Sequence, residues 1–233
     1  DIPSGMYADR GMQKEDVVIH SAFVLSFQSP KIAFFLPETG KYITAWDVVD
    51  IGLDPEFLAK TETDTELIGK QEIQKMYRGR SQFTHKGMYG HSLIIGGSYG
   101  KMGAIILAAK AALRAGSGLV TAYVPQIGVQ ILQTALPEAM VETDNFNGKV
   151  FEEIDFQTEA NAIAIGPGMG TDEKTVDAMG AFLKAQKSPI VIDADALNIL
   201  AKRPSLLEQV PDLSILTPHP GELERLIGKW DDD

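Results

Sequence analysis

Four glycines stand close together in a stretch of the chain that could bind an anion. They follow the apolar run 92–95 and precede an alanine-rich segment ending near residue 115, and they are Gly96, Gly97, Gly100 and Gly103. A glycine loop that enters a helix exposes backbone N–H groups and the positive end of the helix dipole, which suits a phosphate. The spacing matches neither G-x-G-x-x-G nor G-x-x-x-x-G-K-[ST], so two common nucleotide-binding loops are excluded. Taken alone, the loop fits a ligand site and close helix–strand packing equally well.

Three further polar loops follow apolar runs in the second half of the chain. They are Gly166-Pro-Gly-Met-Gly170, Asp193-Ala-Asp-Ala-Leu-Asn198 and Thr217-Pro-His-Pro-Gly-Glu222. In open parallel α/β sheets, ligands bind outside the carboxyl ends of the strands. Four such loops at one edge of a sheet therefore predict a ligand site. Each loop is a weaker indication by itself, because Asp193 or Asp195 could cap a helix and His219, between two prolines, could be structural.

Strand and helix patterns alternate along most of the chain. Apolar runs predict strands at residues 22–27, 31–36, 46–51, 92–95, 118–124, 161–165, 189–192 and 214–216. Helices are predicted from the glycine loop to residue 115 and over residues 126–134, 171–187 and 222–227, with Thr171 as an N-cap. This alternation predicts an α/β fold built on a mostly parallel sheet.

The first part of the chain is organised differently. Residues 1–60 hold strand candidates with no long helix between them, so they look like the end of a larger α/β domain that buries little core by itself. Residues 54–90 are mostly polar and are interpreted as a linker. This linker has room for one helix within residues 65–80, followed by a group of basic side chains.

Composition excludes several classes of function. The net charge is 21 minus 32, or −11, so we expect no general nucleic-acid or anionic-membrane surface, and any phosphate site must be local. The chain has no cysteine, which excludes disulfides and thiolate metal sites. No apolar run approaches the length of a membrane span and no signal peptide is visible, so the sequence predicts a cytoplasmic protein.

Four ordered motifs resemble those of the NAD(P)H-hydrate dehydratase family. They are KGMYGHSLIIGGSYGKMGA, AIGPGMG, VIDADALN and LTPHPGE. The resemblance covers residues 66–233 and implies a ribokinase-like, three-layer fold. The segments DIPSG, AFVLSFQSPKIAFFLP and VVDIGL resemble the end of the Rossmann-like NAD(P)H-hydrate epimerase domain. We therefore expect residues 1–62 to be the remnant of an epimerase domain and residues 63–233 to be the first and central parts of a dehydratase domain.

The resemblance implies repair of damaged nicotinamide cofactors. NADH and NADPH can gain water across a ring double bond to give R and S hydrates. The epimerase domain of this family interconverts the two forms, and the dehydratase domain restores the S form with ADP or ATP. The nucleotide phosphorylates the ring hydroxyl, and the phosphate leaves as the double bond forms, usually with Mg²⁺ on the phosphates. The family also implies K⁺ in the epimerase domain and assembly into a homo-oligomer.

The functional residues of the family map onto named positions of this sequence. Asp1 matches the epimerase acid that contacts the substrate and moves the proton, and Ser4 matches a potassium ligand. The expected contacts to the hydrate in the dehydratase segment are Ala104, Gly168, Gly170 and His219. The residues expected on the nucleotide side, or in support of these contacts, are Gly100, Gly103, Asp193 and Asn198.

Two parts of the family pattern are not found in this sequence. One is the G-[ST]-G-D segment, whose aspartate is the general base and which follows LTPHPGE in the family, together with the adenosine-binding loop. The other is the N-terminal half of the epimerase domain. We therefore expect the 233 residues to be an internal piece of a longer protein, without the dehydratase general base.

Two alternative functions stay open at this point. One is a ribokinase-like vitamin or sugar kinase, against which the GPGMG and TPHPGE motifs and the epimerase-like segment argue. The other is a nucleotide-binding module without catalysis, since the general base is not found in the sequence.

Overall fold

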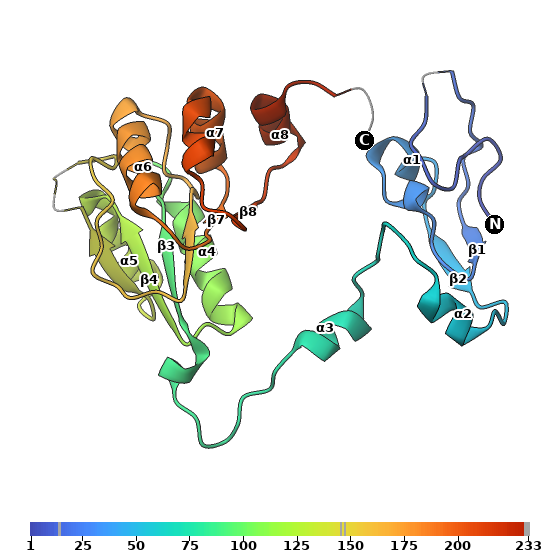
Figure 1. Cartoon of the computed structure of the whole chain (residues 1–233), viewed down its shortest axis with the longest axis horizontal. Coiled ribbons are helices and arrows are strands. Elements are labelled where there is room, and N and C mark those ends of the chain that lie inside the picture. The colour runs from blue at the N-terminus through green and yellow to red at the C-terminus, as the bar shows by residue number, and fades with distance from the viewer. Residues whose placement is uncertain (14, 145, 147, 231–233) are drawn as a thin grey trace. The chain divides into compact units, whose positions relative to one another are not determined.

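The chain forms two compact units, which Figure 1 shows with their elements labelled. In this computed structural model, the described residues are 1–230 except 14, 145 and 147. The first unit contains Asp1–Arg78 and the second contains Gly79–Lys229. The division into epimerase and dehydratase segments between residues 62 and 63 stays a prediction from the sequence.

A six-stranded parallel sheet forms the centre of the second unit. Its strands are β3 (His91–Ile95), β4 (Leu119–Val124), β5 (Met140–Thr143), β6 (Ala162–Ile165), β7 (Val191–Ile192) and β8 (Ile215–Leu216). They lie in the order β5-β4-β3-β6-β7-β8, and every pairing is parallel. The chain thus starts in the middle, runs outward through β5, returns to the middle at β6 and runs outward again. The switch point, where a parallel sheet opens a crevice for ligands, therefore lies between β3 and β6.

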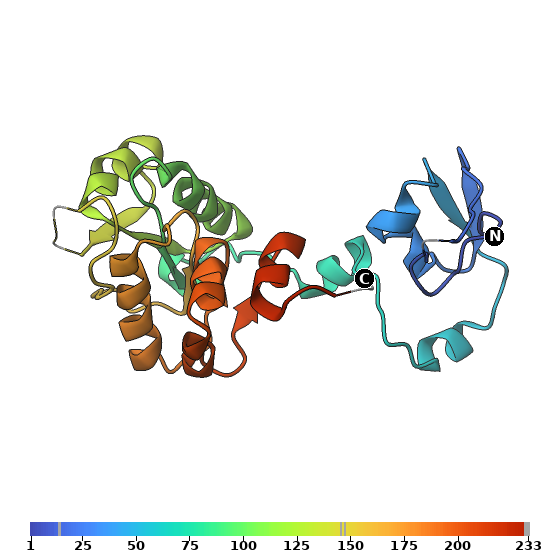
Figure 2. The ribbon, with the colours of Figure 1, turned by 90° about the horizontal axis from the view of Figure 1, so that it is seen from above.

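Helices cover both faces of this sheet, as Figure 2 shows. The helices α4 (Met102–Ala115) and α5 (Val129–Ala135) pack on one face, and α6 (Glu173–Ala185) and α7 (Asp195–Lys202) pack on the other. Further along the chain come the 3₁₀ helix η4 (Pro204–Gln209) and the helix α8 (Pro220–Ile227). This arrangement confirms the predicted α/β fold with a mostly parallel sheet.

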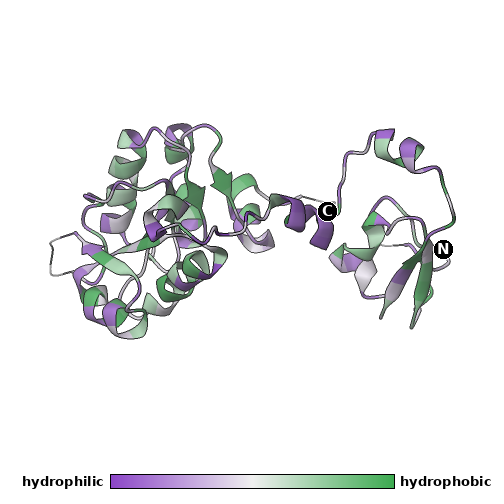
Figure 3. Ribbon diagram, turned by 90° about the horizontal axis from the view of Figure 1, so that it is seen from below, coloured by the Kyte–Doolittle hydropathy of each residue, from purple (hydrophilic) through white to green (hydrophobic). Residues whose placement is uncertain are grey.

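Alternation along the strands explains why both faces carry helices. Leu93 and Ile95 face the cluster of α6 and α7, whereas Ile94 between them packs with the cluster of α4 and α5. All three side chains are buried, as expected for central parallel strands, which read as continuous hydrophobic runs. Figure 3 shows the hydrophobic residues gathered in these strands and on the inner faces of the helices.

The first unit is smaller and contains a two-stranded parallel sheet. Its strands are β1 (Val24–Phe27) and β2 (Trp46–Val49), and its other elements are η1 (Ile32–Phe34) and α1 (Pro37–Gly40). Its core is one small cluster of five buried side chains, Met6, Val18, Val24, Ala33 and Phe34. Two short helices, α2 (Pro55–Lys60) and α3 (Lys70–Met76), follow and bury none of their residues.

Several local predictions need correction. Residues 31–36 were predicted as a strand but contain η1, and Pro37 directly after them begins α1; Phe34 and Phe35 both contact the ring of Trp46. The N-cap of α6 is Asp172, not Thr171, and its carboxylate accepts a hydrogen bond from the N–H of Lys174. Strand β5 was not predicted, because Glu142 and Thr143 interrupt its apolar pattern. Among the described residues, no helix is long and apolar enough to cross a membrane.

Candidate functional site

The loops after β3 and β6 are hydrogen-bonded to each other at the switch point of the sheet. The N–H of Gly97 donates to the carbonyl of Pro167 at 2.8 Å. The hydroxyl of Ser98, which is buried, donates to the carbonyl of Gly168 at 2.8 Å. Because two central strands place these loops side by side, the glycine-rich segments far apart in sequence form one continuous backbone surface.

Glycine is required in the second loop by the close approach of neighbouring backbone. A Cβ atom on Gly166, whose φ is +130°, would lie 1.7 Å from the carbonyl oxygen of Asp193. A Cβ atom on Gly168, whose φ is +68°, would lie 2.5 Å from the carbonyl oxygen of Lys101. No L side chain fits either position. The loop therefore sits directly against the start of α4 and the end of β7.

The first loop leaves its backbone open on the opposite side. A Cβ atom on Gly100 or Gly103 would meet no atom within 4 Å, and both residues are exposed. Ala104 follows within the first turn of α4 and is partly exposed. A ligand can therefore approach Gly100 and Gly103 closely, next to Ala104 and at the positive end of a fourteen-residue helix.

Asp195 ties three elements together at the same edge. Its Oδ2 accepts a hydrogen bond from the N–H of Gly170 at 2.9 Å and lies 3.1 Å from the Nζ of Lys101. Its Oδ1 accepts a longer hydrogen bond, 3.5 Å, from the side-chain amide of Asn198. These contacts use both carboxylate oxygens within the protein, so Asp195 positions the glycine loops.

Asp193 stands in a different environment two residues earlier. The hydroxyl of Thr217 donates to its Oδ1 at 2.9 Å, and within the described residues its Oδ2 accepts no hydrogen bond. Ala194, between the two aspartates, has a φ of +50°, which is uncommon for a residue other than glycine and marks local strain. The sharp turn points the two carboxylates at different partners and leaves one oxygen of Asp193 for a ligand.

A cleft of about 580 Å³ opens beside Asp195, between α7 and α8. Its lining includes the cations Lys202 and Arg225 and also Asn198, whose side-chain oxygen accepts a hydrogen bond from Arg225 at 2.9 Å. Lys202 also contacts the carbonyl of Thr171. Positive side chains beside an anion-binding loop suit the phosphates of a nucleotide.

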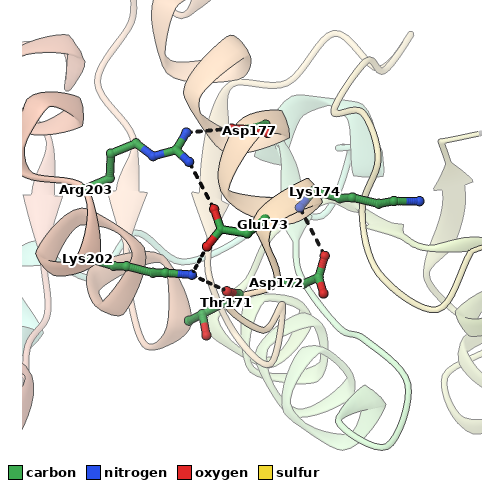
Figure 4. A network of polar contacts seen from close by, with 7 residues as sticks. All are labelled: Thr171, Asp172, Glu173, Lys174, Asp177, Lys202 and Arg203. Atoms are coloured by element: carbon green, nitrogen blue, oxygen red, sulfur yellow. Dashed lines mark hydrogen bonds and ion pairs between the residues drawn. The ribbon is translucent and has the colours of Figure 1, made fainter.

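Ion pairs hold the two helices on this side in register. Figure 4 shows Lys202 and Arg203 reaching from the end of α7 to Glu173, and Arg203 also reaching Asp177 on α6. Hydrogen bonds and charge interactions with these acids raise the pKa of Arg203, so the guanidinium is always charged. Since α6 begins just after the second glycine loop, these pairs fix that loop relative to α7.

His219 is the N-cap of α8. Its Nδ1 accepts a hydrogen bond from the N–H of Gly221 at 3.1 Å, and Glu222 accepts one from the N–H of His219 at 3.0 Å. In the neutral ring the proton therefore lies on Nε2, which is 3.4 Å from Glu222 Oε1. The side chain is 63% exposed, so it remains within reach of a ligand while it caps the helix.

Asp1 and Ser4 belong to the first unit, whereas the loops described above belong to the second. Asp1 Oδ1 accepts hydrogen bonds from the hydroxyl of Ser26 at 3.0 Å and from the N–H of Phe27 at 2.9 Å. Lys31 Nζ lies 3.6 Å from the same oxygen. The carbonyl of Ser4 accepts a hydrogen bond from the N–H of Ile19, and the residue is exposed. A charged carboxylate is thus held at the end of β1.

Two residues of the second unit were not predicted from the sequence as site residues. Ser98 links the two loops and Lys101 pairs with Asp195, although both stand within the glycine loop that the sequence singled out. The only available signal was their position among the glycines. In the described part of the chain, no group of three or more His, Asp or Glu side chains is arranged to hold a metal ion.

Comparisons with known proteins agree with this geometry. A family model for NAD(P)H-hydrate dehydratase matches residues 92–233, which is more than half of the chain. The chain belongs to the NAD(P)H-hydrate dehydratase family. The solved structure of the ADP/ATP-dependent NAD(P)H-hydrate dehydratase from Bacillus subtilis, co-crystallised with ATP and Mg²⁺, is 30% identical, with a TM-score of 0.55. The match covers 69% of this chain and 55% of the Bacillus chain.

Two relatives of this NAD(P)H-hydrate dehydratase family member are longer than the chain itself. The bifunctional NAD(P)H-hydrate repair enzyme Nnr of Moorella thermoacetica is 36% identical over 98% of this chain and 44% of its own length. The Coxiella burnetii enzyme with the same name is 35% identical, again over 98% of this chain, and 45% of its own length. The chain thus spans less than half the length of these curated relatives.

Proposed function

We propose that the second unit takes part in the dehydration of (S)-NAD(P)H hydrate to NADH or NADPH at the expense of ADP or ATP. The observation that carries this proposal is the pair of linked glycine loops at the β3–β6 switch point, with the open positions of Gly100 and Gly103 beside Ala104. Membership in the NAD(P)H-hydrate dehydratase family supports the substrate and the reaction. The proposed reactants are cytoplasmic metabolites, so we place the protein in the cytoplasm.

The proposed reaction has two stages. The ring hydroxyl oxygen bonds to the terminal phosphorus of the nucleotide and loses its proton, while the bond from that phosphorus to the bridging oxygen breaks and AMP or ADP leaves. The C–O bond of the resulting ester then breaks and inorganic phosphate leaves, while a proton leaves the adjacent carbon and the ring double bond forms. Gly168, Gly170 and the backbone of Ala104 would hold the hydrated ring, and His219 would hydrogen-bond to it through Nε2. Neutral imidazole can donate from that atom while Nδ1 stays on the N–H of Gly221.

The nucleotide would lie on the α7 side of the loops. Mg²⁺ needs one or two carboxylate oxygens together with substrate phosphates, and the Oδ2 of Asp193 fits one such ligand. When bound, the ion supplies charge neutralisation on the phosphates. Asn198 would act in support, because its side chain joins Asp195 to Arg225. No described residue is assigned as the general base.

For the first unit, we propose a part in interconversion of the R and S hydrates. Asp1 would contact the hydrate and move the proton, since the hydroxyl of Ser26 and the N–H of Phe27 hold its carboxylate in place. The exposed carbonyl of Ser4 has a second lone pair and fits one ligand of a K⁺ ion among several. In this proposal, residues 1–62 belong to the epimerase domain and residues 63–233 to the dehydratase domain, and the whole protein forms a homo-oligomer.

Turnover of defined hydrates tests these assignments. The complete gene product should convert S hydrates to NADH or NADPH with ADP or ATP, and should use R hydrates through epimerisation. Phosphorylation of a vitamin or sugar alcohol without repair of the hydrate would show that the protein is a kinase and not a dehydratase. Binding of nucleotides with no turnover would show that it is a binding module.

His219→Ala sharpens the test for the substrate contact. The variant should raise the KM for the S hydrate by about 5- to 150-fold, because a bound hydrate would cover this position and keep a polar group without a partner, which costs about 1–3 kcal/mol. Loss of the cap on α8 should lower stability by about 1 kcal/mol. A normal KM with a large fall in melting temperature would make His219 purely structural. His219→Asn, which keeps a capping side chain, separates the two effects.

A further inference from the structure

A second cleft, of about 700 Å³, opens on the other side of the glycine loop. Its polar lining comes from Gln126, Gln130, Gln133, Thr134, Gly148 and Lys149, with two aliphatic side chains beside them. Although the chain has a net charge of −11, the described residues of this lining include one cation and no acid. Neutral amides with a single ammonium suit a ligand that has hydrogen-bonding edges and one phosphate.

Tyr99 connects this cleft to the glycine loop. Its N–H donates to the carbonyl of Lys149 at 2.8 Å, and the ammonium of Lys149 lies 4.4 Å from the centre of the Tyr99 ring. The ring is 62% exposed although it is large and apolar. An exposed aromatic ring next to a cation, at the rim of an amide-lined cleft, provides a stacking surface for a base.

Two packing features make this arrangement rigid. The side chain of Met102 fills the space between the glycine loop and the start of α5, since a Cβ atom on Gly97 would lie 2.8 Å from its Cε and one on Gly128 would lie 2.3 Å from it. The carboxylate of Asp144, which is buried, accepts hydrogen bonds from the N–H groups of Phe146 and Glu152 on either side of Lys149. These contacts link the glycine loop to the start of α5 and hold Phe146 and Glu152 on Asp144.

We propose that this cleft binds the adenosine-phosphate half of the hydrated dinucleotide, with the adenine ring on Tyr99 and a phosphate on Lys149. The inference rests on the proposed function of the glycine loops. The hydrated ring occupies those loops, so the rest of the dinucleotide must leave on one of two sides. The cleft by α7 has Lys202 and Arg225 and suits the more highly charged ADP or ATP. The amide-lined cleft by α5 then binds the adenosine-phosphate half of the dinucleotide.

Kinetics with a truncated substrate test the assignment. In the complete gene product, Lys149→Ala should raise the KM for hydrated NADPH and hydrated NADH about 10-fold, equivalent to about 1.4 kcal/mol. The KM for hydrated NMNH, which lacks the adenosine phosphate, should stay unchanged, as should kcat. Tyr99→Ala should act in the same way, and Tyr99→Phe should restore the wild-type values. Lys110→Ala, at an exposed lysine of α4, is the matched control.

Three results would overturn the inference. They are an equal rise in KM for the mononucleotide, no rise for either dinucleotide, and a rise in the KM for ATP instead. If the wild-type protein turns over no hydrate, the proposed function fails separately. In that case, calorimetry with ADP-ribose and NMN tests the cleft separately. The inference requires that Lys149→Ala weakens the binding of ADP-ribose and leaves the binding of NMN unchanged.

Discussion

The two units cover the apolar faces of their sheets to different extents. In the second unit, helices cover both faces of a six-stranded sheet and bury two large clusters of side chains. In the first unit, one face of the two-stranded sheet leaves Leu25, Phe27 and Val49 exposed. Burial of apolar surface supplies most of the free energy of folding, so stability should be concentrated in the second unit.

The candidate sites reflect this difference. The second unit aligns four loops because neighbouring parallel strands fix their starting points. The first unit holds Asp1 by contacts at the end of one strand. A site made of several backbone segments therefore needs a sheet that is fixed from both sides, whereas a single carboxylate can be held with much less.

The largest effect is expected from a methyl group at the switch point. Gly166→Ala places a carbon atom against the backbone carbonyl of Asp193 at a φ of +130°, so it should destabilise the second unit by about 3 kcal/mol, at the top of the ordinary range. Gly103→Ala, at an open position in α4, should be neutral or stabilise by up to about 1 kcal/mol. Chemical denaturation measures both, and equal stabilities would refute the close packing.

A cavity in each core tests whether the units unfold separately. Leu93→Ala should cost the second unit about 2–5 kcal/mol, while the unfolding of the first unit stays unchanged. In a Trp230→Phe background, Trp46 fluorescence reports the first unit alone, and far-ultraviolet circular dichroism reports mainly the second. Val24→Ala should shift only the fluorescence transition. A single shared transition in all variants would mean that the units unfold together.

A smaller effect, confined to the second unit, comes from Asp144. Burial raises the pKa of its carboxyl above the ordinary value, so the folded state binds a proton more readily than the unfolded state. Its contribution to stability is therefore greatest at low pH and is lost as the pH rises through the raised pKa. Asp144→Asn should remove this dependence, so the stability of the wild type should fall relative to that of the variant as the pH rises above about 4. A constant difference would contradict the pKa direction.

The smallest effect is expected in the exposed helix α2. Lys60 and Glu56 form an ion pair there, with both side chains more than 70% exposed. Glu56→Gln should change the free energy of unfolding by at most about 0.5 kcal/mol, and 1 M salt should abolish the change. A larger loss, measured by denaturation of the first unit, would show that α2 is packed more firmly than its exposure indicates.

Much of the second unit was predictable because its strands are short, apolar and followed by glycine or aspartate. The runs ending at Ile95 and Ile165 indicated two strands of a parallel sheet, and the structure shows that they are its two central strands. Strand β5 was missed because Glu142, which lies in it, accepts hydrogen bonds from Thr158 and from the N–H of Gln157. Such partners come from distant segments, so the local pattern gives no sign of them.

The candidate site was predictable as a location, but its internal contacts were not. The carboxyl-edge rule predicts Gly100, Gly168 and Asp193 at one edge of the sheet, where they follow β3, β6 and β7, and their role in a site stays a prediction. It could not distinguish Asp195, whose oxygens are used within the protein, from Asp193, which keeps one oxygen open. That distinction depends on the positive φ of Ala194, a strained conformation that alanine does not indicate in a sequence.

The strand order also has a consequence for biosynthesis. Ser98 and Gly168, which join the two central loops, are 70 residues apart in the chain. At about 5–20 residues per second, a ribosome needs roughly 4–14 s to make that interval. During this time one edge of β3 has no neighbour, and an open edge of this kind can pair with other chains. The nascent protein should therefore bind chaperones most strongly in this interval, until β6 emerges and closes the sheet.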